Sequence, residues 1–343
     1  MIRAALDALT NAGIPFATRG EQPIDDPPRG GDVDILVGAA DADKTEEVLT
    51  AAGMRRLVSP GHRRHRFYLA FDPDRAQWMK LDVSLVPRRF GWDLRARDDR
   101  SLARFADYRT GTKAAPRPAE RLWSALSRKR PLGPRRQGAV VAVLGPDGAG
   151  KGTIISQLRA EIPATVTPVY LGHGQSGERY RSARPARGRG PAGTVVRSAL
   201  ALLPGVARDA QYRARRALRL SLRCWRAWAC AWRGDLVVCD RYPLDALVVD
   251  AGDARPGPRL EGWIVSRLTP WPDAVVLLDA PAEVLRARKP ESSREQIERL
   301  RREYRSVFVC RGATVVLTTG DESASVGATS AVLWRALSER RGW

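Results

Sequence analysis

Residues 138–161 read Gly-Ala-Val-Val-Ala-Val-Leu-Gly-Pro-Asp-Gly-Ala-Gly-Lys-Gly-Thr-Ile-Ile-Ser-Gln-Leu-Arg-Ala-Glu, and this stretch decides the fold of the C-terminal part of the chain. The apolar run 139–144 predicts a buried strand, and the residues from Gly150 onward predict a helix. The turn between them is rich in glycine, so backbone N–H groups can point inward around an anion. The N-terminus of the following helix adds the positive end of its dipole. The stretch therefore predicts a phosphate-binding turn.

The residues expected to hold a nucleotide in this turn are Gly145, Gly148, Ala149, Gly150, Lys151, Gly152 and Thr153. Lys151 is expected to supply positive charge to a transferring phosphoryl group. In the strict form of this phosphate-binding motif, a Ser or Thr directly follows the lysine, and its hydroxyl ligates magnesium. Gly152 takes that position here, so the hydroxyl candidate for the metal is Thr153. The alternative is a glycine-rich turn with a surface lysine and no ligand.

Two further apolar runs end in acidic residues. Residues 235–242 read Asp-Leu-Val-Val-Cys-Asp-Arg-Tyr, and residues 272–281 read Pro-Asp-Ala-Val-Val-Leu-Leu-Asp-Ala-Pro. A carboxylate at the C-terminal end of a strand beside a phosphate loop suits magnesium, so Asp240 is the metal candidate. The planar guanidinium group of Arg241 can donate hydrogen bonds to two phosphate oxygens at once. A surface salt bridge is the alternative for this pair.

Apolar strands alternate with helices throughout the C-terminal part. Such continuous apolar runs are typical of a parallel sheet that helices cover on both faces. We therefore expect an α/β fold with a parallel five-stranded sheet. The expected strands are 139–144, 166–171, 236–239, 274–278 and 313–317, and the expected helices include 282–288, 294–308 and a final one.

These motifs carry a family resemblance over residues 139–340. Gly-Pro-Asp-Gly-Ala-Gly-Lys resembles thymidylate kinases, and Gly-Lys-Gly-Thr resembles adenylate kinases; both belong to the nucleoside monophosphate kinase group. The Asp-Arg-Tyr and Leu-Asp-x-Pro strands, followed by a basic lid, resemble thymidylate kinases again. The resemblance implies ATP and Mg²⁺ as cofactors and phosphoryl transfer to a nucleoside monophosphate or another small phosphorylated acceptor. It assigns phosphate contacts to Arg241 and to the lid residues Arg286, Arg288 and Lys289, and it places Asp147 near the acceptor sugar.

The segment 176–233 is expected to be a basic insert, because it holds fourteen arginines against Glu178 and Asp209. Its second half predicts a helix in which Leu218, Leu222, Trp225, Ala229 and Trp232 form the packing face. Arginines 215, 219, 223 and 226 lie alongside. The insert could grip the acceptor phosphate, contact nucleic acid, or lie on an anionic membrane. A packing helix with a solvated arginine face is the alternative.

The N-terminal part predicts a smaller α/β domain over residues 1–130, with 131–137 as linker and 138–343 as the kinase-like domain. Asp32 and Asp34 lie two apart on an expected strand, so they share one face, and Asp82 lies on another. The arrangement resembles a minimal nucleotidyltransferase domain, in which such acids hold magnesium. The family's Gly-Ser step is replaced by Arg19-Gly20-Glu21, which argues against transfer. We expect His62 and His65 to be solvated loop residues, with a substrate contact as the alternative.

Three functions stay open at this point: a kinase alone, a bifunctional nucleotidyltransferase and kinase, and a nucleotide-gated protein that binds nucleic acid or membrane. The net charge of +20 over 343 residues favours phosphate-rich partners. The four cysteines show no metal-ligand spacing, and no signal peptide or spanning segment is evident, so we expect a soluble cytoplasmic protein. A homodimer stays open.

Overall fold

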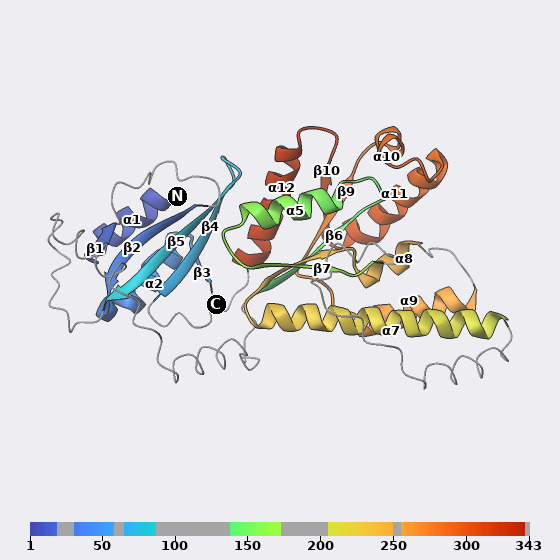
Figure 1. Ribbon diagram of the computed structural model, residues 1–343, viewed down its shortest axis with the longest axis horizontal. Helices are drawn as coiled ribbons and strands as arrows, with labels where there is room; N and C mark the ends of the chain where they lie inside the picture. The colour runs from blue at the N-terminus through green and yellow to red at the C-terminus, as the bar shows by residue number, and fades with distance from the viewer. Residues whose placement is uncertain (19–30, 58–64, 87–137, 173–204, 250–254, 340–343) are drawn as a thin grey trace, which may run out of the picture.

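The computed structural model describes residues 1–18, 31–57, 65–86, 138–172, 205–249 and 255–339. The linker at 131–137, residues 176–204 of the basic insert, the Arg19-Gly20-Glu21 step and His62 lie outside the described residues. The described chain forms two five-stranded sheets, one from the N-terminal part and one from the C-terminal part (Figure 1).

The C-terminal sheet is parallel throughout, which confirms the prediction. Its strands lie in the order β10-β9-β6-β8-β7. Their bounds are β6 Ala139–Leu144, β7 Val166–Tyr170, β8 Leu236–Asp240, β9 Ala274–Asp279 and β10 Thr314–Leu317. Every residue of the central strand β6 is buried, because helices cover both of its faces.

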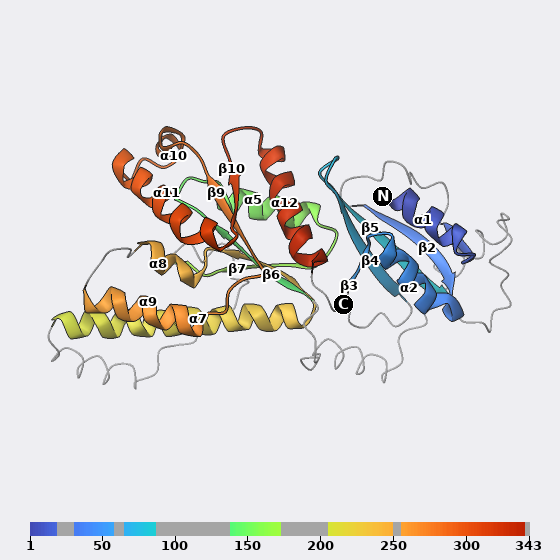
Figure 2. The same ribbon diagram turned by 180° about the vertical axis from the view of Figure 1, so that it is seen from behind.

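Helices cover both faces of this sheet, as Figures 1 and 2 show. Val141 and Val143 of β6 pack with α5 (Lys151–Glu161) and α12 (Glu322–Ser338). The alternate side chains of β6 pack with α7 (Gly205–Trp232) and α9 (Pro256–Leu268). The remaining helices of this part are α8 Ala246–Val249, α10 Ala282–Arg288 and α11 Arg294–Phe308, with 3₁₀ turns at Pro243–Asp245 and Val309–Arg311.

The packing face predicted for α7 is wrong. Leu218, Leu222 and Trp225 are exposed to 43%, 62% and 53%. The buried face instead carries Leu220 and five small residues, namely Ala217, Ser221, Cys224, Ala227 and Ala231. Both sets recur at spacings of three and four, so periodicity did not separate them. Small side chains let α7 lie close to the sheet and to α9, which explains why they are the residues that pack.

The N-terminal sheet is mixed, with strands in the order β1-β2-β5-β4-β3. The strands are β1 Phe16–Thr18, β2 Asp32–Gly38, β3 Arg55–Leu57, β4 His65–Asp72 and β5 Gln77–Val86. β2 runs parallel to β5, and the other pairs are antiparallel. The helices α1 (Ile2–Asn11) and α2 (Ala42–Ala51) belong to the same part, and α1 packs with β2 and β5 in one apolar cluster. The short edge strand β3 was not predicted.

The two sheets meet through α12. Trp78 of β5 belongs to the same buried cluster as the apolar side of α12, and its ring lies edge-on to Trp334 at 6.0 Å between centroids. Arg55 of β3 donates a hydrogen bond of 2.9 Å to the carbonyl of Ser338, near the end of α12. The N-terminal sheet and the C-terminal sheet therefore share part of one hydrophobic core.

All four cysteines are free. Among the described helices, none is both long and apolar enough to cross a membrane.

Candidate phosphoryl-transfer site

The glycine-rich turn between β6 and α5 has a backbone that side chains disfavour. Gly145, Gly148 and Gly150 have φ angles of 138°, 86° and 80°. A Cβ at Gly145 would also overlap the carbonyl oxygen of Leu278 in β9. The turn therefore needs glycine both for its conformation and for its close approach to the neighbouring strand.

Lys151 begins α5 and folds back over the turn. Its Nζ donates hydrogen bonds of 2.8 Å to the carbonyls of Gly145 and of Pro146. Burial, together with repulsion from Arg241, lowers the pKa of Lys151 to about 8. The ammonium group is thus held inside the turn, where an anion would relieve the cost of its burial.

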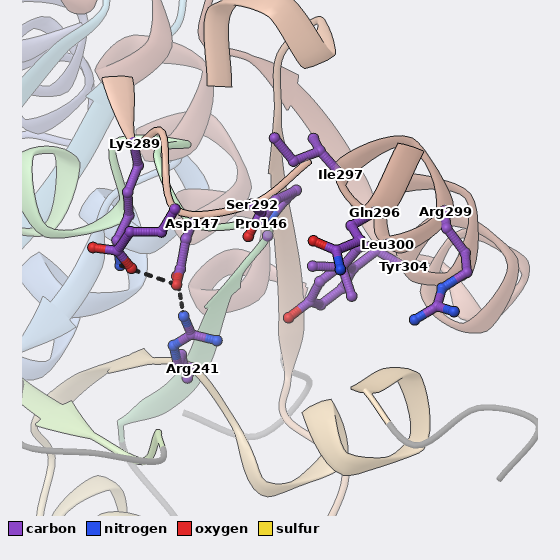
Figure 3. Close-up of a pocket in the computed structure, with 12 residues that line it drawn as sticks. Pro146, Asp147, Arg241, Lys289, Ser292, Gln296, Ile297, Arg299, Leu300 and Tyr304 are labelled. Atoms are coloured by element: carbon purple, nitrogen blue, oxygen red, sulfur yellow. Dashed lines mark hydrogen bonds and ion pairs between the residues drawn. The ribbon is translucent and has the colours of Figure 1, made fainter. Parts of the chain in front are cut away.

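Asp147 lies inside the turn and contacts three cations. Arg241 and Lys289 donate hydrogen bonds to its carboxylate, the latter at 3.2 Å, and the Lys151 Nζ lies 3.8 Å away (Figure 3). Burial by itself would raise the pKa of Asp147, but the charges of Arg241 and Lys151 and the Lys289 hydrogen bond outweigh it and lower the pKa. Cations from three separate elements therefore converge beside the loop.

A pocket of about 310 Å³ opens on this side of the loop. The loop, β8, the segment after α10, and α11 supply its walls. Its lining residues are Gly145, Pro146, Asp147, Arg241, Lys289, Glu291, Ser292, Gln296, Ile297, Arg299, Leu300 and Tyr304. Of these, Figure 3 shows Asp147 lying between Lys289 and Arg241, with Gln296 and Tyr304 across from them. We call this the Asp147 pocket.

A second pocket, of about 340 Å³, lies against the other end of the loop. It is bounded by the start of α5, the end of α10 and the segment that leads into α12. Its lining residues are Ala149, Gly150, Thr153, Ile154, Arg288, Thr318, Gly320, Glu322 and Ser325. We call this the Thr153 pocket. Gly145, Pro146 and Asp147 line one pocket, and Ala149, Gly150 and Thr153 line the other, so the glycine turn lies between the two.

Asp240 is the last residue of β8, the strand that pairs with β6, and it is only 9% exposed. The next residue, Arg241, has a left-handed backbone with φ of 65° and reaches two carboxylates, Asp147 and, at 3.9 Å, Asp245. Sequence reasoning missed Asp245, although it follows Asp240 by one short 3₁₀ turn. Burial raises the pKa of Asp245 to about 6, even though Arg241 and Lys151 lower it.

The three predicted lid residues, Arg286, Arg288 and Lys289, lie in three different places. Arg288 donates a hydrogen bond of 2.8 Å to the Thr318 carbonyl and lines the Thr153 pocket, and Lys289 lines the Asp147 pocket. Arg286 is exposed and lines neither pocket. The structure thus brings two of the three predicted lid cations to the loop.

Asp279 anchors helix α11, a role that the sequence did not indicate. Asp279, at the end of β9, accepts hydrogen bonds of 2.7 Å from Arg301 Nε and 2.6 Å from Arg305 Nη2. Although burial opposes it, the hydrogen bonds from both arginines lower the pKa of Asp279. The pairing fixes α11, and with it Gln296 and Tyr304, against the end of the sheet.

The acids of the N-terminal sheet also converge. Asp34 and Asp82 face each other in the parallel register of β2 and β5, and ligand atoms of Asp32, Asp34 and Asp82 all lie within 4.8 Å of one another. The prediction that His65 is a solvated loop residue is wrong. It begins β4, and its Nδ1 lies 3.0 Å from Asp82 Oδ1. Lys80 contacts Asp32 at 3.2 Å.

No protein-family model matches the chain. No curated protein matches it. Solved structures that match include thymidylate kinase from Candida albicans, described in terms of broad substrate specificity, at 14% identity and a TM-score of 0.37; 57% of this chain and 91% of that chain are covered. Thymidylate kinase from Ehrlichia chaffeensis matches at 13% identity and a TM-score of 0.35, with 57% and 97% covered.

Proposed function

We propose that residues 138–343 form an ATP-dependent kinase that transfers a phosphoryl group to a nucleoside monophosphate or a related small phosphorylated acceptor. The observation that carries this proposal is the position of Lys151. It lies in a glycine turn with one pocket at each end, so a donor and an acceptor could meet across its ammonium group. A site that only binds a nucleotide needs one such pocket.

The Thr153 pocket suits the donor. It adjoins the N-terminus of α5, where backbone N–H groups attract phosphate oxygens. Arg288 and the Thr318 hydroxyl add polar groups to its wall, and Ile154 adds an apolar one. In this arrangement the terminal phosphate lies toward Lys151.

The Asp147 pocket suits a phosphorylated acceptor. Arg241 and Lys289 are cations in its wall, and both contact the carboxylate of Asp147 in the described structure. Arg241 also contacts Asp245, and Lys289 also contacts Glu291. The phosphate of an acceptor would offer oxygen atoms in a similar position. Arg241 and Lys289 could then bind that phosphate in place of the Asp147 carboxylate. Asp147 is then free to accept a hydrogen bond from an acceptor hydroxyl.

Magnesium would neutralise charge on the donor phosphates. Asp240 and Thr153 are the residues that would hold it. Both offer the hard oxygen donors that Mg²⁺ prefers, and Asp240 lies close enough to Lys151 for its charge to raise the lysine pKa. Lys151 and Arg241 orient the phosphates, and α11, fixed by Asp279, supplies one wall of the Asp147 pocket.

The direct test is ATP consumption by the purified chain across a panel of nucleoside monophosphates and sugar phosphates. We expect one acceptor class to stimulate turnover, and we expect Lys151→Ala to abolish the stimulation. A matched control is Lys44→Ala, an exposed lysine in α2. The proposal fails if no acceptor stimulates turnover, or if Lys151→Ala turns over as fast as the wild type.

A second function has support from the N-terminal sheet: metal-dependent nucleotidyl transfer, which would make the chain bifunctional. The convergence of Asp32, Asp34 and Asp82 supports it, because paired carboxylates can hold magnesium beside a nucleotide α-phosphate. We expect α-labelled nucleotide to leave label on a product, and Asp34→Asn to remove it. Asp7→Asn, on an exposed side of α1, is the control. An unlabelled product from the wild type would contradict this function.

A further inference from the structure

One surface of the kinase-like part is unusual because apolar and cationic side chains are exposed together. It is formed by α7 and α9, which lie side by side on the face of the sheet opposite α5 and α12 (Figures 1 and 2). Leu218, Leu222 and Trp225 follow one another at spacings of four and three, so they form a single stripe along α7. Each is exposed by more than two fifths. We call this the Leu222 stripe.

A cationic stripe runs beside it. Arg219, Arg223 and Arg226 each follow a member of the Leu222 stripe by one residue, so each is turned about 100° around the helix from its neighbour. All three are exposed, and none has a carboxylate partner within the part of the chain that the structure describes. Arg208 and Arg215 continue the same side toward the N-terminus of α7.

Arginines of the same helix that point inward behave differently. Arg216 donates hydrogen bonds of 2.8 and 2.5 Å to Glu261 of α9, a residue that is fully buried, and Arg213 contacts the same carboxylate at 3.2 Å. The inner arginines therefore hold α7 against α9. The outer ones serve no such contact within the described structure, so their charge is available to a partner.

The apolar part of the surface extends onto α9. Trp225 Nε1 donates a hydrogen bond of 2.9 Å to the carbonyl of Leu268 at the end of that helix. Leu268 is itself 43% exposed. The exposed Trp225 of α7 therefore lies next to the exposed Leu268 of α9, and the apolar surface continues from one helix to the other.

We infer that this surface binds an anionic lipid bilayer, with the Leu222 stripe at the headgroup boundary and the arginines on lipid phosphates. A second copy of the chain is disfavoured, because the outer side of α7 carries five arginines and, apart from Asp209 near its start, no acid that could neutralise a partner's arginines. Nucleic acid would use the arginines and Trp225 but gives the leucines no apolar environment. A bilayer accommodates both kinds of side chain.

The test uses the full-length protein and vesicles of phosphatidylcholine with or without phosphatidylglycerol. We expect co-sedimentation with the anionic vesicles alone, and we expect added salt to weaken it. The triple variant Arg219→Gln, Arg223→Gln, Arg226→Gln should weaken binding by about 100-fold. Leu218→Ser with Leu222→Ser should weaken it about tenfold, because apolar burial in the interface is lost.

The matched control removes three exposed arginines from other helices: Arg159→Gln in α5, Arg302→Gln in α11 and Arg335→Gln in α12. It should bind as the wild type does, and unchanged unfolding midpoints show that every variant folds. Absence of wild-type binding to anionic vesicles overturns the inference, as does equal binding by the α7 variant and the control. Two other results also overturn it: arginine-dependent binding of single-stranded nucleic acid without vesicle binding, or a dimer lost with the leucines.

Discussion

Arg241, the residue after β8, donates a hydrogen bond to Asp147, which lies 94 positions earlier in the glycine turn. The contact joins two elements that must both meet a phosphate if the site transfers one. It also shows how the described state balances its charge: three cations share one loop carboxylate. An incoming phosphate would compete with Asp147 for the same groups.

The first prediction concerns the guanidinium group of Arg241. Arg241→Lys keeps the charge but cannot contact two oxygens with fixed geometry. We expect kcat/KM for the acceptor to fall on the order of 100-fold while the KM for ATP changes little. Initial rates with each substrate varied in turn measure this. Arg302→Lys, at an exposed position of α11, is the control. An equal loss of kcat/KM for both substrates would contradict the assignment of Arg241 to the acceptor.

The second prediction follows from the pKa of Lys151, which the fold lowers to about 8. Below that pH the free protein holds the protonated lysine, which attracts phosphate. Above it the lysine must take up a proton before it binds, so ATP affinity should fall by about tenfold per pH unit. Calorimetric titration with ATP from neutral pH upward measures this. Lys151→Met should bind weakly with no such dependence, and a shared pH profile would contradict the assignment.

The third prediction concerns Asp245, whose pKa is raised from 3.8 to about 6. Between these values the folded state binds more protons than the unfolded state, so the free energy of unfolding decreases as the pH rises through this window. Asp245→Asn removes the free-energy cost of ionising this buried carboxyl group. It should therefore be more stable than the wild type at neutral pH, by ~3 kcal/mol, and the difference should shrink toward pH 4.

Denaturant unfolding of both proteins at neutral and acidic pH measures the effect of Asp245→Asn. Activity should decrease, because Arg241 loses one of its two carboxylates. Asp7→Asn serves as the control for a general effect of charge. A variant less stable than the wild type at neutral pH would show that the Arg241 contact outweighs the cost of burial.

The fourth prediction concerns the core that the two sheets share. Trp78 is 2% exposed and packs against α12 through Trp334. Trp78→Ala should cost about 3 to 5 kcal/mol in unfolding free energy. We also expect it to divide one cooperative thermal transition into two, because the sheets lose their common contact. Trp263→Ala, at a 59% exposed position, should change neither quantity. Two transitions in the wild type would contradict this account.

Features that depend on local sequence were predicted well. The strand, glycine turn and helix around Lys151 are contiguous, and the alternation of apolar runs with helices was enough to predict the parallel sheet. The edge strand β3 carries Arg-Arg-Leu and has no apolar run, so its formation depends on pairing with β4. Local patterns contain no signal for such a strand.

Features that depend on distant partners were missed. Asp279 was recognised as the end of a strand, but its contacts with Arg301 and Arg305 require α11 to pack across the sheet end. The packing face of α7 was misassigned because larger apolar residues drew the prediction. A helix that packs closely against two elements selects its small residues instead.

We propose that ATP in the Thr153 pocket transfers its terminal phosphoryl group, beside Lys151, to an acceptor in the Asp147 pocket. The most direct test is transfer of label from γ-labelled ATP to the acceptor that stimulates turnover, with the product isolated and counted. We expect labelled product from the wild type and from Lys44→Met, and a loss on the order of 1,000-fold from Lys151→Met. Label released only as inorganic phosphate, or equal product from Lys151→Met, would contradict the claim.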